Sequence, residues 1–312
     1  MSTMLPMTFG NPKSKNERIA RDALLTKSLR DDTMKWSYAS EYPLVLGPDG
    51  DVTSWCSYSG DQLVAHANLW PRQLQNVSGT RTLPIGLIGN VATCPAHRGH
   101  GHMSTLMSYL AQVAHSQGLQ ALVLWSDLFK FYQNLGFTSI GREWRFRITQ
   151  GDRPQRTGID LQELHLLDDN EITSLMSMRP KLEWTLDRSI EEFRTLLRIP
   201  DTHLFIRRKG QRIASWMVIG KGSDMRGVIH EWGAISPSEL ISDIQSLLQD
   251  LDIPELMLLT PGHLHQHWLI PLKQYSAENS EHSMALGLPI GPHGKEALVS
   301  LAKGFIWGLD SI

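Results

Sequence analysis

A short glycine-rich segment with one arginine could bind a phosphate group. It reads Arg98-Gly99-His100-Gly101-His102-Met103 and stands directly before a stretch with helical periodicity. The first turn of a helix has backbone N–H groups without partners and a partial positive charge, and both favour a bound phosphate. Glycines let the backbone approach the phosphate oxygens, and the arginine adds a charged donor. The segment therefore predicts a pyrophosphate-binding loop.

A second segment, about thirty residues further on, could supply a proton donor. It reads Phe131-Tyr132-Gln133-Asn134-Leu135-Gly136-Phe137 and predicts a short helix that ends near the glycine. Tyrosine has a reference pKa near 10, so its hydroxyl is protonated at neutral pH and can give a proton to a base that forms beside it. Tyr132 could equally pack between the neighbouring phenylalanines without any chemical role.

The elements around these two segments predict a layered α/β (α+β) domain. Strands are expected at 52–58, 62–70, 83–93, 119–125 and 142–148. A helix is expected from about 101 to 117, because apolar residues recur at helical spacing through Met103, Leu106, Met107 and Leu110. The phosphate loop would then lie between a strand and the helix that follows it. The tyrosine would lie just after the next strand.

The C-terminal half repeats part of this order without the glycine-rich loop. A polar stretch at 150–154 contains a glycine and a proline, and it divides the chain into predicted domains 1–150 and 151–312. In the second domain Ser236-Pro237-Ser238-Glu239 predicts a capped helix start immediately after a strand at 227–234. The second domain is therefore expected to share the skeleton and to lack the phosphate site.

Composition and charge exclude several classes of protein. The 312 residues are 41% hydrophobic and 20% charged, with a formal net charge of −2, so no excess of positive charge favours nucleic acid or an anionic membrane surface. Two cysteines, Cys56 and Cys94, are too few for a disulfide framework, and no run reaches the ~20 apolar residues of a membrane span. We expect a cytoplasmic protein without a nucleic-acid partner or membrane anchor, and a homo-oligomer is compatible with the sequence.

Residues 50–148 resemble the GNAT superfamily of N-acetyltransferases. In that family a V-x-T-like strand end leads into an R/Q-x-x-G-x-G/A loop, as Val91-Ala92-Thr93 leads into Arg98 to Met103 here, and an F-Y-x-x-L-G-F segment follows. Met103 departs from the pattern, because a small residue is usual at its position. The doubled order and Gly89-Asn90 are most similar to tandem proteins of the enhanced-intracellular-survival type, whose additional C-terminal domain this chain is expected to lack in complete form.

The resemblance implies tandem GNAT-like domains, each with a mixed, mostly antiparallel central sheet flanked by helices. It implies acetyl-CoA as co-substrate and direct transfer of the acetyl group to a primary amine of a small molecule or a peptide. Tyr132 is implied as the acid that protonates the CoA thiolate, and backbone N–H groups around Asn90 would hold the thioester carbonyl. The implied cofactor-binding residues are Asn90, Val91, Ala92, Thr93, Arg98, Gly99, His100, Gly101, His102, Met103 and Ser104.

The sequence says less about the residues that would bind the acceptor amine. Trp36, His66 and Glu231 are candidates to border the acceptor side of the site, although a large aromatic side chain can equally fill a core. The general base could be His66, Glu231 or the free carboxylate that ends the chain. An exposed amine could also react without a dedicated general base. An acid in an apolar strand requires a partner or a function, so Glu231, with Asp310, would favour a cationic acceptor.

Two other functions and a metal site are alternatives to this hypothesis. His97, His100 and His102, and separately His263, His265 and His267, alternate without carboxylate or cysteine partners, which favours loop histidines over a zinc site. A non-catalytic acyl-CoA-binding sensor would keep the loop and dispense with the tyrosine acid. A tRNA-dependent aminoacyl transferase would need a basic groove, which the composition does not favour.

Overall fold

The described chain forms two compact units. A computed structural model describes residues 7–30, 34–47, 50–151 and 158–312. The first unit comprises Met1–Ile140, Ala285–Leu301 and Ser311–Ile312, and the second comprises Gly141–Met284 and Ala302–Asp310. This division differs from a single boundary at residue 150, because β13 (Glu278–Pro289) returns the chain to the first unit and pairs there with β5 (Ala121–Leu124). Most of the predicted linker at 150–154 lies outside the described residues.

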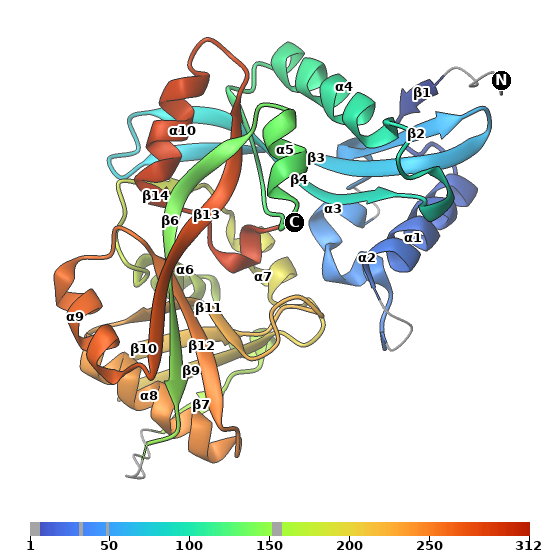
Figure 1. The fold of residues 1–312 in the computed structure, drawn as a ribbon. Helices are drawn as coiled ribbons and strands as arrows, with labels where there is room; N and C mark the ends of the chain where they lie inside the picture. The colour runs from blue at the N-terminus through green and yellow to red at the C-terminus, as the bar shows by residue number, and fades with distance from the viewer. Residues whose placement is uncertain (1–6, 31–33, 48–49, 152–157) are drawn as a thin grey trace. The chain divides into compact units, whose positions relative to one another are not determined.

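A sheet forms the centre of the first unit (Figure 1). From one edge its strands are β1 (Met7–Gly10), β2 (Ser54–Ser59), β3 (Gln62–Asn76), β4 (Thr82–Thr93), β5 and the end of β13. All neighbours are antiparallel except β4 and β5, which are parallel. Long stretches of β3 and β4 and the whole of β5 are buried, as expected for near-continuous apolar runs covered on both faces.

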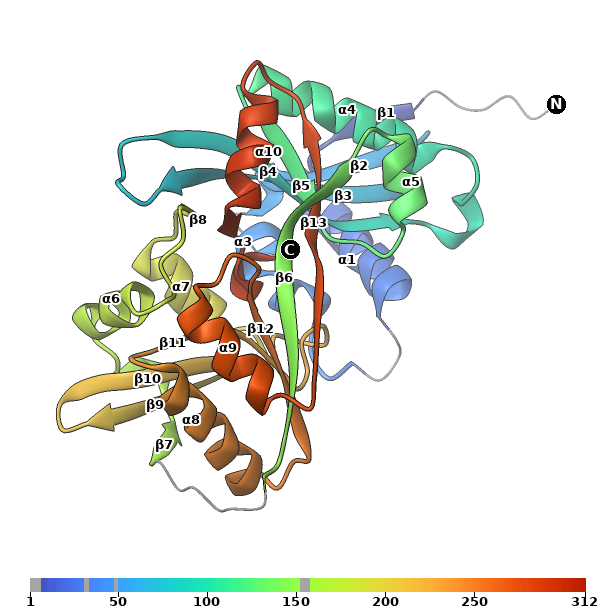
Figure 2. The same cartoon turned by 60° about the vertical axis from the view of Figure 1, so that its left-hand side comes forward.

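Helices cover both faces of this sheet, with α1 and α4 on opposite sides in two views (Figures 1 and 2). The first unit contains α1 (Lys15–Leu29), α2 (Tyr38–Glu41), α3 (Pro43–Leu46), α4 (His102–Ser116), α5 (Phe129–Asn134) and all but the last residue of α10 (Gly294–Ala302). Two 3-10 turns complete it, at Gly50–Thr53 and Pro95–His97. The apolar face predicted for α4 is confirmed, because Leu106 and Leu110 are buried in one cluster with Leu122 of β5.

The parallel pair β4 and β5 stays together over only three positions. Ile85, Gly86 and Leu87 pair with Ala121, Leu122 and Val123. Beyond Leu87, β4 runs on to Thr93, whereas β5 ends at Leu124. On its opposite edge β4 stays paired with β3 up to Thr93, apart from one irregularity at Asn90 and Val91. The edge of β4 that faces β5 is therefore open from Ile88 onward.

The second unit contains a run of six paired strands. The strands follow the order β6 (Thr138–Thr149), β12 (Glu255–Pro261), β11 (Val228–Ala234), β10 (Arg212–Ile219), β9 (His203–Lys209) and β7 (Ile159–Leu161), and only β11 with β12 is parallel. A short parallel pair, β8 (Trp184–Leu186) with β14 (Gly304–Phe305), lies apart from this order. The helices are α6 (Asp169–Ser177), α7 (Ile190–Leu196), α8 (Pro237–Asp250) and α9 (Gln266–Tyr275), with 3-10 turns at Leu164–Leu166 and Gly308–Asp310.

The two units share one arrangement of strand, helix and parallel strand. In the first unit this is β4, α4 and β5, with residues 94–101 between the strand and the helix. In the second it is β11, α8 and β12, with only residues 235–236 between strand and helix. The connection from strand to helix is therefore much shorter in the second unit than in the first. No helix in the described part of the chain has the length and apolarity needed to cross a membrane.

A buried ion-pair network stabilises the second unit. Arg188 contacts Glu231 at 2.8 Å and Asp310 at 2.5 Å, and the side chains of Arg188 and Glu231 are completely inaccessible to solvent. Arg179 makes a further contact with Glu231 at 3.2 Å. Because each buried charge has an opposite charge within hydrogen-bond distance, the desolvation cost of the network is offset as long as every member is present.

Removal of the Glu231 charge should destabilise the protein strongly. Glu231→Gln leaves Arg188 and Arg179 without one of their counter-ions, so we expect the free energy of unfolding in urea to fall by about 3 kcal/mol or more. Glu278→Gln is the matched control, because Glu278 pairs with Arg147 at the surface, 3.1 Å away, with three quarters of its own side chain exposed. Similar, small effects of both substitutions would contradict this account.

Candidate functional site

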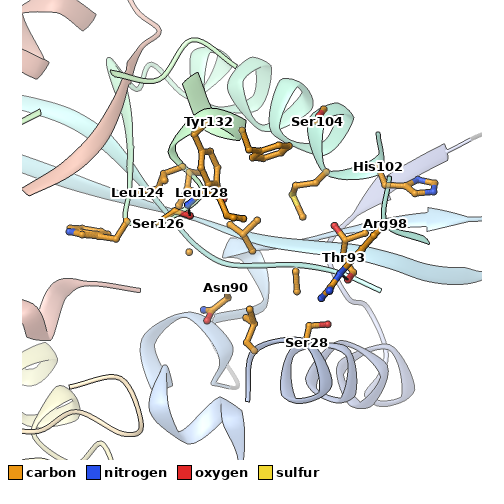
Figure 3. Close-up of a pocket in the computed structure, with 18 of the residues that line it drawn as sticks. Ser28, Asn90, Thr93, Arg98, His102, Ser104, Leu124, Ser126, Leu128 and Tyr132 are labelled. Atoms are coloured by element: carbon orange, nitrogen blue, oxygen red, sulfur yellow. Dashed lines mark hydrogen bonds between the residues drawn. The ribbon is translucent and has the colours of Figure 1, made fainter. Parts of the chain in front are cut away.

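A cavity of about 910 Å³ lies in the first unit, where β4 and β5 diverge. Figure 3 shows that Asn90 and Thr93 of β4 face the same hollow as Leu124 and Ser126 at the end of β5. The start of α4 closes one end of the hollow, with His102 and Ser104. The open edge of β4 therefore faces a cavity large enough for a sizeable ligand.

Most of the predicted site residues line this cavity. They are Asn90, Val91, Ala92, Thr93, Arg98, Gly99, Gly101, His102, Met103, Ser104 and Tyr132. His100 does not line it: its side chain is exposed, and its Nδ1 lies 2.9 Å from the carbonyl oxygen of Arg98. The structure thus brings the predicted phosphate loop and the predicted proton donor to one hollow.

The glycine-rich loop ends at the uncapped N-terminus of α4. Gly99 and Gly101 have φ values of +79° and +78°, in the left-handed region that only glycine enters at little cost. Gly101 is the N-cap residue of α4, so no side chain bonds the first N–H groups of the helix, and its first turn contains no acidic residue. These N–H groups and the exposed Arg98 suit the phosphates of a cofactor.

Three histidines surround the start of α4. The ring of His102 lies 5.7 Å from that of His97 and 6.2 Å from that of His100, measured between centroids. Burial, and then the proximity of His97 and His100, lowers the pKa of His102 below its usual 6.5. His102 is therefore neutral at neutral pH in the free protein, and a bound phosphate would favour its protonated form.

Tyr132 is both packed and part of the cavity wall. Its ring makes edge-to-face contacts with Phe131, 5.0 Å away, and with Phe137, 5.6 Å away. Burial raises the pKa of Tyr132 to about 12, and a hydrogen bond with the Ser126 side chain acts in the opposite direction. The hydroxyl therefore stays protonated over the whole range of ordinary assay conditions. Figure 3 shows the ring extending from α5 towards the end of β5.

Trp36, His66 and Glu231, predicted for the acceptor side, do not line the cavity. Trp36 is half-buried, and its indole N–H donates to Glu41 at 2.6 Å. His66 is completely buried in β3, and burial lowers its pKa to about 3, which leaves it too weak a base to accept a proton from an amine. Glu231 belongs to the ion-pair network of the second unit. Since Arg188 holds both Glu231 and Asp310, the argument for a cationic acceptor loses its basis.

Other residues of the wall carry no motif that the sequence could have revealed. Arg30 at the end of α1, Tyr38 and Tyr42 line the cavity although they lie some fifty residues before β4 reaches it. Ile312 also lines it, close to Gly89: a Cβ atom at position 89 would collide with the main-chain carbonyl of Ile312. In the sequence, only Gly89 indicated that another segment lies here. A glycine inside an apolar strand often marks a position that another backbone approaches closely.

Comparisons with known proteins identify this domain. Residues 38–140 match the family model described as an acetyltransferase (GNAT) domain. The chain carries a GNAT acyltransferase domain. No curated protein sequence matches the chain significantly. The tertiary structure, by contrast, has many similar solved structures.

Three of these structures illustrate the range. A GCN5-related N-acetyltransferase from Anabaena variabilis ATCC 29413 is 14% identical, with a TM-score of 0.64, over 90% of this chain and 72% of that one. Eis1 from Mycobacterium abscessus is 13% identical, with a TM-score of 0.56, over 91% and 74%. N-myristoyltransferase from Saccharomyces cerevisiae with bound myristoyl-CoA is 11% identical, with a TM-score of 0.57, over 97% and 89%. At such identities the likeness shows the fold, and the predicted GNAT fold class is confirmed.

The match of residues 38–140 indicates which class of ligand the cavity could hold. GNAT domains bind acyl-CoA and transfer its acyl group, so this match indicates an acyltransferase. The observed cavity fits such a ligand in two ways. The N–H groups at the uncapped start of α4 can bind phosphates, and main-chain groups on the open edge of β4 can form hydrogen bonds with an extended ligand.

The affinity for acyl-CoA should increase as the pH falls. Phosphates beside His102 would raise the pKa that burial lowers, so binding takes up a proton. We expect binding to tighten roughly two- to five-fold between about pH 8 and about pH 6.5. Isothermal titration at both pH values would measure this, and His102→Asn should weaken the dependence. His115→Asn, an exposed histidine in the last turn of α4, is the control. An equal pH dependence in all three proteins would count against a role for His102.

Proposed function

We propose that the protein is an N-acetyltransferase that moves the acetyl group of acetyl-CoA to a primary amine of a small molecule or a peptide. The observation that carries the proposal is the convergence of the glycine-rich loop, the open edge of β4 and Tyr132 on one cavity. The similarity of residues 38–140 to acetyltransferase domains supports the acetyl group in particular.

Each part of the cavity has a task in this reaction. The N–H groups at the start of α4, with Arg98, would hold the pyrophosphate, and Thr93, Met103 and Ser104 line the same end. Main-chain N–H groups of Asn90, Val91 and Ala92 would hold and polarise the thioester carbonyl. Fixing both ends of the cofactor places the carbonyl carbon where a neutral amine can approach it.

The chemical step balances without any further reactant. The amine nitrogen attacks the carbonyl carbon, a C–N bond forms, and the C–S bond breaks as the tetrahedral intermediate collapses. The leaving thiolate takes a proton from Tyr132, and the acylated nitrogen loses one to water. Proton exchange with water then restores Tyr132.

The energy of the proton transfer from Tyr132 depends on burial. Between the Tyr132 pKa of about 12 and a free thiol pKa near 8.5 the transfer is uphill by about 3.5 units, or roughly 5 kcal/mol. A thiolate in the same cavity is also desolvated, so the pKa of the CoA thiol rises and the difference between the two pKa values becomes smaller. The lowering effect of the Ser126 hydrogen bond is already contained in the Tyr132 pKa of about 12.

The second unit would not bind acyl-CoA in this scheme. The start of α8 is occupied by its own side chains: Ser236 accepts a hydrogen bond from the Glu239 N–H at 3.3 Å, and Pro237 has no N–H to offer. The Glu239 carboxylate, which pairs with Arg207 and Lys209, also lies in this first turn. We propose that this unit is a degenerate GNAT-like domain that acts as a partner of the catalytic domain.

Binding of acetyl-CoA can be tested by titration calorimetry. We expect Arg98→Ala to weaken the affinity about ten-fold, because a charged donor to the pyrophosphate is lost. Arg81→Ala is the control, since Arg81 is an exposed residue of the first unit that pairs with Glu296. Absence of binding by the wild type would refute the proposed cofactor, and tighter binding of a longer acyl-CoA would replace acetyl by that group.

The role of Tyr132 can be tested by kinetics. Tyr132→Phe keeps the edge-to-face packing and removes the proton, so kcat should fall about 100-fold with the Kd for acetyl-CoA unchanged. The rate would be followed as CoA release with n-butylamine, phenethylamine and a tetrapeptide with a free N-terminus as acceptors. Tyr109→Phe is the control, because Tyr109 of α4 stacks on Phe9 of β1 and is not among the residues that line the cavity. A sensor without catalysis would bind acetyl-CoA and release no CoA with any acceptor.

A further inference from the structure

Asn90 has an unusual backbone conformation inside a buried strand. Its φ is +50°, and among the three described non-glycine residues with positive φ it alone lines the cavity. A left-handed residue in the middle of a strand costs free energy and persists only where its surroundings hold it in place. The contacts of Asn90 are therefore informative about the site.

The conformation belongs to a bulge in the pairing of β3 with β4. His66 pairs with Ala92 and Asn68 pairs with Gly89, so Asn90 and Val91 together face the single residue Ala67. A bulge leaves its extra residue without a partner in the ladder and re-aims the local backbone. The main-chain donors that the proposed reaction needs thus lie in a segment whose shape the β3 ladder does not fix.

Side chains fix this shape instead. The hydroxyl of Tyr38, from α2, donates to Oδ1 of Asn90 at 2.6 Å, and Nδ2 of Asn90 donates to Oδ1 of Asn68 at 2.9 Å. Asn68 is itself held, because its Nδ2 donates to the hydroxyl oxygen of Thr53 at 2.9 Å and to the carbonyl oxygen of Val45 at 3.1 Å. The Asn90 amide is therefore clamped between α2 and the interior of the sheet.

His66 holds the main chain of the same residue. Its Nδ1 lies 2.9 Å from the carbonyl oxygen of Asn90, which can only accept, so the hydrogen is on Nδ1. Burial lowers the pKa of His66 to about 3, and the bond to Asn90 acts against this shift. The ring is thus a neutral, constant donor that turns the Asn90 carbonyl towards β3.

We propose that Tyr38 and His66 are positioning residues for acyl transfer, which hold Asn90 in its left-handed conformation from two sides. In this arrangement the carbonyl and the side chain of Asn90 are both engaged in hydrogen bonds within the protein. The N–H groups of the bulge would then be the donors to the thioester carbonyl. The inference rests on the proposed function and adds to it the elements that shape the site. Tyr38 reaches the bulge from a four-residue helix that is remote in sequence.

A substitution at position 90 separates positioning from other roles of Tyr38. Glycine adopts positive φ without cost, so Asn90→Gly makes the clamp unnecessary for the backbone shape. Tyr38→Phe removes only the hydroxyl. If the hydroxyl acts through the conformation of Asn90, its loss matters in the wild-type background and has no effect in the Asn90→Gly background.

The experiment compares wild type, Tyr38→Phe, Asn90→Gly and the double variant, with CoA release assayed using whichever of n-butylamine, phenethylamine and the tetrapeptide the wild type turns over fastest. We expect Tyr38→Phe to lower kcat about ten-fold with the acetyl-CoA Kd unchanged, and the double variant to match Asn90→Gly. Tyr109→Phe is the control here too, because Tyr109 stacks on Phe9 and is not among the residues that line the cavity. Thermal unfolding of each variant would confirm folding.

Three outcomes would overturn the inference. An unchanged kcat in Tyr38→Phe would show that the hydroxyl is dispensable. An equal loss from Tyr38→Phe in both backgrounds would show that Tyr38 acts on the substrate directly or on the fold in general. Wild-type protein that turns over no acceptor would refute the proposed function itself, and this result is distinct because it appears before any variant is compared.

Discussion

The early end of the pairing between β4 and β5 is the constraint on which the site depends. Backbone N–H and C=O groups in a sheet interior need partners, and β5 supplies them to β4 only as far as Leu87. Beyond this point the edge of β4 faces a cavity, and an extended ligand can take the place of a strand. The apolar cluster beneath α4 holds the two strands where they do meet, so the opening is fixed by the core.

The two units differ at the start of the helix by only a few residues. Both have a parallel strand pair connected through a helix. In the first unit Gly101 precedes the helix and leaves its N–H groups without a side-chain cap. In the second unit Ser236, Pro237 and Glu239 cap that end, remove a donor and add a negative charge. The shared skeleton therefore has different chemistry at equivalent ends.

Burial determines the protonation of the groups in and beside the cavity. It keeps Tyr132 protonated, and it keeps His66 and His102 neutral. The favourable field for an anionic cofactor therefore comes from main-chain N–H groups and from Arg98 at the surface, and the interior contributes neutral hydrogen bonds of fixed direction. Such pre-oriented dipoles need no rearrangement when charge develops on a thioester oxygen.

The sequence by itself determined the features that depend on short, continuous segments. Glycine spacing specifies the left-handed turns before α4, apolar periodicity specifies its buried face, and the segment around Tyr132 specifies a short helix after β5, because all three follow from local backbone chemistry. Only the tertiary structure decided the rest. It brought Tyr38 to the cavity, paired Glu231 with buried arginines and buried His66 beneath the bulge, since these outcomes depend on contacts between residues far apart in the chain.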